Sequence, residues 1–91
     1  MRTLRWEAEA RHQYRDTLTY IASHDVAAAE RLRGSIDAKL ELLARFAEIG
    51  RPGRIRRTRE LIVHPNYIII YTIRRNSIDI IRFLHARQLY P

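Results

Sequence analysis

The last third of the chain, from Arg59 to Pro91, constrains the fold more than any other segment. β-branched and aromatic residues dominate it, and two polar breaks interrupt them, at Pro65-Asn66 and at residues 74–76. Runs of such residues between short polar breaks are typical of β-strands joined by tight turns. The segment therefore predicts three consecutive antiparallel strands.

The middle one of these strands, Tyr67 to Ile73, is apolar on both faces. Because side chains alternate along a strand, Ile68 and Ile70 share one face, and the other face holds Tyr67, Ile69, Tyr71 and Ile73. A strand that is apolar on both sides is usually central in its sheet, with a layer packed over at least one face. We therefore expect the N-terminal half of the chain to form that layer.

The N-terminal half predicts an edge strand over residues 3–6, followed by two helices. Each helix has an apolar stripe: Ala10, Tyr14, Leu18, Ile21 and Ala22 in the first, and Val26, Ala29, Ile36, Leu40, Leu43 and Ala47 in the second, flanked by Leu32 and Phe46. We expect the first helix to end near Ser23-His24 and Asp25 to cap the second, so the connection is short enough to force an antiparallel hairpin.

These elements predict an α+β fold of the order β-α-α-β-β-β, with the helix hairpin packed on a small, mainly antiparallel sheet. The length of 91 residues corresponds to a single domain spanning residues 1–91. Gly34 lies inside the second helix, and we expect a close approach to the first helix to account for it.

The charge of the chain is strongly positive and unevenly placed. The net charge is +7, and the composition includes no cysteine, which excludes disulfides and thiolate chemistry. Residues 1–47 hold eight basic and seven acidic side chains, whereas residues 48–91 hold nine and three. No hydrophobic run approaches a membrane span, and the N-terminus lacks the apolar segment of a signal peptide, so we expect a cytoplasmic protein that does not enter a membrane.

Five arginines lie within nine residues between the second predicted helix and the first strand of the meander. This arginine cluster consists of Arg51, Arg54, Arg56, Arg57 and Arg59, in a loop that also contains Gly50, Pro52 and Gly53. One interpretation is a solvated loop, which is the commonest role of a charge run. The other is a binding patch for a polyanion, either nucleic acid or an acidic polypeptide tail.

Several segments together resemble one family of bacterial proteins. They are residues 20–22, 27–32 and 50–54, then Thr58-Arg59-Glu60-Leu61-Ile62-Val63, residues 64–71, and the ending Leu84-His85-Ala86-Arg87-Gln88. In this order they resemble the RelE/ParE superfamily of toxins from type II toxin–antitoxin modules, and the ParE-like branch most of all. The resemblance implies the fold described above and a cognate acidic antitoxin whose disordered part folds around the toxin. The arginine cluster is then the candidate patch for binding this antitoxin or another polyanion.

The resemblance also implies two alternative functions. RelE-like members are ribonucleases that cleave messenger RNA, whereas ParE-like members inhibit DNA gyrase by binding. RelE-like nucleases carry a basic residue directly after the tyrosine that opens the third strand, but Ile68 follows Tyr67 here. The second strand likewise offers Leu61, Ile62 and Val63 where nucleases carry lysines or arginines. The sequence therefore favours a gyrase inhibitor without catalytic residues.

The nuclease alternative would depend on three residues near the C-terminus. His85 could act as a general base, Arg87 could stabilise the charged phosphorane, and Tyr90 could assist. A further alternative is a degenerate toxin that retains only antitoxin binding. We expect no cofactor and no metal site, because the four histidines lack the spacing of metal ligands.

Overall fold

The computed structural model describes residues 2–91. Its elements are β1 (Thr3–Trp6), α1 (Ala8–His24), α2 (Val26–Arg45), β2 (Arg51–Pro52), β3 (Arg59–His64), β4 (Tyr67–Ile73) and β5 (Ser77–His85). The predicted order of elements is confirmed, with one addition. The two-residue strand β2 lies in the segment that we expected to be loop throughout.

The strands form one sheet in the order β1-β5-β4-β3-β2. The meander of β3, β4 and β5 is antiparallel, as predicted, and β4 is its central strand. Strand β1 lies at one edge and pairs in parallel with β5, so the first and last strands of the chain are neighbours. Strand β2 forms the opposite edge and pairs with the start of β3.

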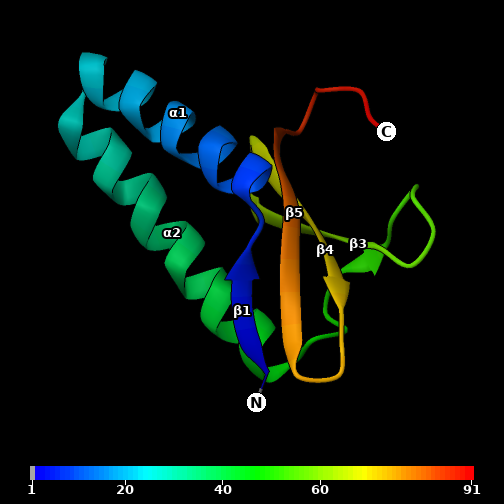
Figure 1. The fold of residues 1–91 in the computed structure, drawn as a ribbon. Coiled ribbons are helices and arrows are strands. Elements are labelled where there is room, and N and C mark those ends of the chain that lie inside the picture. Colours follow the sequence, from blue (N-terminus) through cyan, green and yellow to red (C-terminus); the bar gives the residue numbers. More distant parts are fainter. Residues whose placement is uncertain (1) are drawn as a thin grey trace.

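The helix hairpin covers one face of this sheet (Figure 1). Helix α1 ends at His24, and the Asp25 carboxylate accepts a hydrogen bond of 3.1 Å from the Ala28 backbone N–H, which caps α2 as predicted. In Figure 1 the loop before β3 and the C-terminal residues lie on the other side of the sheet. None of the helices within residues 2–91 is both long and apolar enough to cross a membrane.

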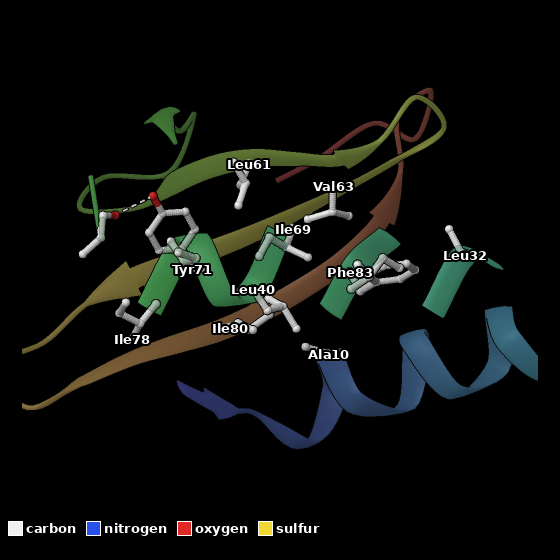
Figure 2. Close-up of a cluster of buried hydrophobic side chains, with 13 residues drawn as sticks. Ala10, Leu32, Leu40, Leu61, Val63, Ile69, Tyr71, Ile78, Ile80 and Phe83 are labelled. Atoms are coloured by element: carbon white, nitrogen blue, oxygen red, sulfur yellow. Dashed lines mark hydrogen bonds between the residues drawn. The ribbon is translucent and has the colours of Figure 1, made fainter. Parts of the chain in front are cut away.

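The main core lies between the hairpin and the sheet (Figure 2). It contains Ala10, Leu32, Ile36, Leu40, Leu43, Ala47, Leu61, Val63, Ile69, Tyr71, Ile78, Ile80 and Phe83. The buried Tyr71 hydroxyl donates to the Ala47 carbonyl (2.7 Å) and accepts from the Gly50 N–H (2.9 Å). The central strand is thereby bonded to the segment that follows α2. The expected packing of the hairpin on these strands is confirmed, and Tyr14, Leu18 and Ile21 of the first stripe pack against this core from α1.

Three details of the helical stripes differ from the prediction. Val26 is 62% exposed because it opens α2 at the tip of the hairpin, away from the sheet, whereas Leu32 is a core residue rather than a flanking one. A Cβ atom added at Gly34 would meet nothing within 4 Å. The expectation of a close approach at Gly34 was therefore wrong.

The second face of the sheet has an apolar cluster of its own. Ile68, Ile70, Leu84 and Tyr90 are buried there, and Ile55 and Ile81 pack against them. Ile55 comes from the loop before β3 and Tyr90 from the C-terminal residues, so these two segments cover the isoleucines of β4. Strand β4 is therefore buried on both faces.

Candidate functional site

The sheet carries no basic side chain at the position that follows Tyr67. Ile68 is 6% exposed and pairs with Ile62 of β3 and Leu84 of β5, all apolar residues. On the adjacent strand, Leu61 and Val63 point into the main core beneath the helices. An isoleucine buried in an apolar cluster can neither bind a phosphate nor transfer a proton.

His85 lies at the end of β5 on the helix side of the sheet. Its ring and that of Tyr67 meet edge to face, with 5.4 Å between the ring centres. The Tyr67 ring in turn stacks on that of Phe83, with 5.3 Å between the ring centres. The Nδ1 atom of His85 accepts a hydrogen bond of 3.1 Å from the Arg87 backbone N–H. Because that bond occupies the Nδ1 lone pair, the neutral ring carries its proton on Nε2.

Tyr90 lies on the opposite face of the sheet from His85. Its ring is buried with Ile68 and Ile70, and the Arg54 guanidinium lies 5.3 Å from the ring centre. Arg54 also donates a hydrogen bond of 3.2 Å to the Tyr90 carbonyl. Arg87 is exposed in the turn that follows β5. The structure therefore does not bring the three residues of the nuclease alternative together.

An open hollow of about 410 Å³ lies beside His85, between α1 and the adjoining ends of β4 and β5. Helix α1 contributes Gln13, Asp16 and Tyr20 to its wall, but no arginine or lysine lines it. A site that cleaves RNA needs cationic groups around the phosphate, whereas the Asp16 carboxylate would repel one. The hollow is thus poorly suited to phosphate chemistry.

Three side chains of the arginine cluster are bonded to other parts of the protein, and two are not. Arg51 forms an ion pair with the buried Glu60 (Nε to Oε1, 2.8 Å), and Arg59 donates to the carbonyls of Gly50 (2.6 Å) and Glu48 (3.2 Å). Arg54 is bound to Tyr90, as described above. The side chains of Arg56 and Arg57 are exposed, without a hydrogen bond or ion pair to any residue in the range 2–91.

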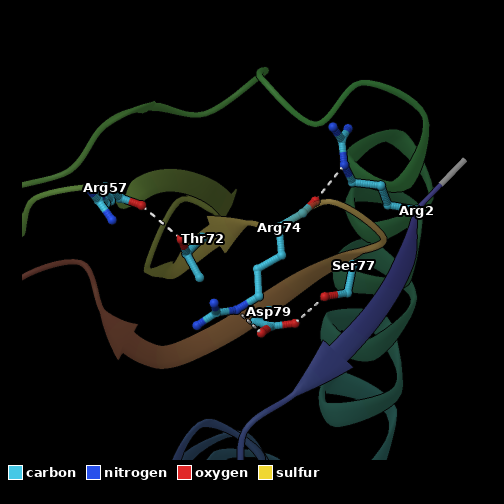
Figure 3. Close-up of polar contacts among 6 residues, drawn as sticks. All are labelled: Arg2, Arg57, Thr72, Arg74, Ser77 and Asp79. Carbon is cyan, nitrogen blue, oxygen red and sulfur yellow. Dashed lines mark hydrogen bonds and ion pairs between the residues drawn. The ribbon is translucent and has the colours of Figure 1, made fainter.

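A second polar network surrounds Asp79 on the face of the sheet that the helices do not cover (Figure 3). Its carboxylate accepts hydrogen bonds from the Ser77 hydroxyl (2.8 Å) and the Arg74 guanidinium (2.7 Å). The Ser77 bond, the Arg74 bond and the nearby charge of Arg5 lower the pKa of Asp79 below its ordinary value, although burial acts in the opposite direction. The sequence analysis missed this network, although an aspartate between Ile78 and Ile80 was a usable signal.

The outer side of the hairpin carries a continuous depression, which we call the hairpin crease. It consists of two adjoining hollows of about 340 and 280 Å³ that share Leu18 and Arg33. Trp6 and Tyr14, stacked at 5.0 Å, line one end, and Val26 lies at the other. Three arginines border the first hollow, namely Arg11, Arg15 and Arg33.

Metal ligation has no candidate in the part of the chain that the structure describes. Within residues 2–91, no three histidine, aspartate or glutamate side chains gather as a metal ion requires.

Comparison with known proteins identifies the class to which this fold and sequence belong. The family described as "ParE toxin of type II toxin-antitoxin system, parDE" matches residues 4–90. A protein of Sinorhizobium fredii, named "Putative toxin Y4kP", is 37% identical over 89 residues, which are 97% of this chain and 92% of the relative. The chain therefore belongs to the ParE toxin family and is a toxin of a type II toxin–antitoxin system, which implies an antitoxin partner.

Solved structures agree on the fold. A chain of the chromosomal ParDE toxin–antitoxin system of P. aeruginosa has a TM-score of 0.79 at 17% identity, and the match covers 93% of this chain and 96% of that one. YoeB of Staphylococcus aureus, solved as a dimer, has a TM-score of 0.63 at 14% identity, with 89% and 92% covered. At these identities the likeness concerns the fold alone.

Proposed function

We propose that this toxin inhibits DNA gyrase by binding to it, without performing chemistry, and that its cognate antitoxin neutralises it. The proposal follows from membership of the ParE family, because gyrase inhibition is the activity that the resemblance to ParE-like toxins implies. The alternative is messenger RNA cleavage of the RelE type.

The observation that carries the proposal is the burial of Ile68 in the apolar cluster on the second face of the sheet. Removing one preorganised group that stabilises transition-state charge typically lowers a rate on the order of a hundredfold or more. Here the position after Tyr67 is apolar, and the Nδ1 atom of His85 is occupied by the Arg87 backbone N–H. Little catalysis of RNA cleavage is expected from such an arrangement.

A paired assay tests the proposal. The purified toxin is added to gyrase with relaxed plasmid and, separately, to translating ribosomes with a defined message. We expect loss of supercoiling or trapping of cleaved DNA in the first reaction and an intact message in the second. Inhibition should persist in His85→Ala, and prior mixing with the antitoxin should relieve it.

The opposite pattern would identify a nuclease. If the message is cleaved and His85→Ala or Arg87→Ala abolishes the cleavage, the gyrase proposal fails. The two variants are suitable because both side chains are exposed and neither belongs to a core cluster.

For the antitoxin we propose docking at the hairpin crease. Its floor offers the apolar surfaces of Trp6, Tyr14 and Leu18, and arginines border it. A segment with apolar anchors and flanking acidic residues would complement both features. Leu18→Glu should therefore weaken antitoxin binding, because it places a negative charge on the apolar floor; Ala38→Glu, exposed on α2 and lining neither hollow, is the matched charge control. Equal affinities of the two variants for the antitoxin would argue against docking at the crease.

A further inference from the structure

We propose that the sheet face opposite the helices binds the sugar-phosphate backbone of duplex DNA. Five arginines form this surface, which we call the basic face: Arg5, Arg51, Arg54, Arg57 and Arg74. The inference rests on the proposed function, since a toxin bound to gyrase would use the basic face to hold the DNA that gyrase carries.

The register of the sheet places the first members of the basic face together. Arg5 of β1 is paired with Asp79 of β5, which is paired with Thr72 of β4, so the three side chains form a row across the sheet. The neighbouring residues Ile78, Ile80 and Tyr71 point into the main core, which puts this row on the other face. The Arg74 guanidinium reaches the row through Asp79, and the Thr72 hydroxyl donates to the Arg57 carbonyl (2.9 Å), as Figure 3 shows.

The remaining two arginines extend the same face. Arg51 is bonded to Glu60, which is paired with Ile70 of the second apolar cluster. Arg54 lies over Tyr90, a member of that cluster. Five arginines from distant parts of the sequence therefore converge on the face that the hairpin leaves uncovered.

The negative charges on this side of the molecule are few and already neutralised. Between residues 49 and 91 the acidic side chains are Glu60 and Asp79. Both are buried, and each is held by an arginine at 2.7–2.8 Å. The basic face thus presents five arginines, two of them paired with buried carboxylates, so its net charge is positive and attracts a polyanion.

The chemistry of the face favours a phosphate backbone over an acidic protein segment. An arginine guanidinium group can form two hydrogen bonds to one phosphate at once. Recognition of the DNA backbone needs positive charge rather than apolar pockets. A protein segment would need apolar anchor sites, but Ile68 and Ile70 are buried beneath Tyr90 and Ile55. Ile62 of β3, 51% exposed, is the apolar side chain that this face still offers beside them.

The test measures binding of the isolated toxin to a short, fluorescently labelled DNA duplex by anisotropy, between about 50 and 200 mM salt. The variants are Arg5→Gln and Arg57→Asn, both at exposed positions outside the two buried ion pairs. Asparagine suits position 57, where φ is 66°, because it tolerates left-handed backbone. Arg31→Gln, exposed on α2, is the control for each single variant, because all three remove one positive charge.

We expect the unaltered toxin to bind the duplex with a log–log salt slope of about −3 or steeper. The double variant Arg5→Gln/Arg57→Asn should lose roughly fivefold to tenfold in affinity, and each substitution should reduce the slope by about one, whereas Arg31→Gln changes little. No binding by the unaltered toxin at about 50 mM salt, or equal binding by the double variant and Arg31→Gln, would overturn the proposal.

A parallel titration with polyglutamate separates nucleic acid from protein. The double variant could lose affinity for polyglutamate and yet bind the duplex as tightly as Arg31→Gln does. In that case the face is a protein-docking surface and the DNA proposal fails. Binding of the toxin to gyrase, measured in the absence of DNA, tests the proposed function separately from DNA binding by the basic face. A toxin that binds the duplex but not gyrase would contradict the proposed function and leave the basic face intact.

Discussion

At the scale of single residues, Asp79 shows how one buried carboxylate organises a polar network. Ser77 and Arg74 hold its two oxygens, and Arg5 lies near enough to lower its pKa further. A buried carboxylate without such partners would be strongly unfavourable, so the exposed Arg74 is needed for stability as well as for surface charge.

This network predicts the acid dependence of stability. Because the pKa of Asp79 is lower in the folded chain than its ordinary 3.8, its contribution is complete above about pH 4 and is lost as the pH falls through the folded value. Asp79→Asn should lower the free energy of unfolding by roughly 1.5–3 kcal/mol at neutral pH, since a charged hydrogen bond is lost. The difference between the two proteins should shrink towards pH 2–3 in denaturant titrations; a difference independent of pH would contradict the assignment.

At the scale of elements, α2 contains a glycine that its surroundings do not require. A Cβ at Gly34 would meet nothing within 4 Å, whereas at Gly50 it would lie 2.6 Å from the Tyr71 hydroxyl and 2.7 Å from the Glu60 carbonyl. Glycine loses more backbone freedom on folding than alanine does, so it weakens a helix interior.

Gly34→Ala is therefore expected to stabilise the protein by about 0.5–1 kcal/mol, measured by thermal or denaturant unfolding. Gly50→Ala serves as the contrasting variant and should destabilise it, because the methyl group displaces the hydroxyl that joins α2 to β4. A destabilised Gly34→Ala protein would show that the helix packs more closely at this position than the structure indicates.

At the scale of the whole molecule, charge is distributed unevenly between the two sides. The hairpin carries nearly balanced charges around the hairpin crease, and the uncovered side of the sheet carries the basic face. The net charge of +7 should accelerate encounter with an acidic antitoxin from any direction.

Association with the cognate antitoxin should then slow markedly as salt rises from about 0.05 to 0.5 M, because exposed charges are screened over a few ångströms at the upper end. Stopped-flow mixing at both salt concentrations measures this rate. The dissociation rate should change far less, since it depends on the contacts within the complex. An association rate that salt does not alter would remove the electrostatic steering.

The sequence alone determined the order of elements and the main core. Alternation along β4 showed that both of its faces are buried, and the helical period showed which residues of α1 and α2 meet the sheet, because these patterns are local. The same locality identified the C-terminal boundary of α1 and the Asp25 cap. It also located Ile68, on which the proposal of gyrase inhibition depends, because this position is recognised from the neighbouring Tyr67 alone.

Only the tertiary structure decided which distant residues share a face. The arginine cluster was visible as a run of charge, but Arg59 is bound to the Gly50 carbonyl, and Arg5 and Arg74 join the basic face from elsewhere in the chain. His85 and Tyr90, five positions apart, lie on opposite sides of the sheet. Strand pairing and the path of the C-terminal residues set these positions. Both depend on contacts between segments that are remote in sequence, which no local pattern encodes.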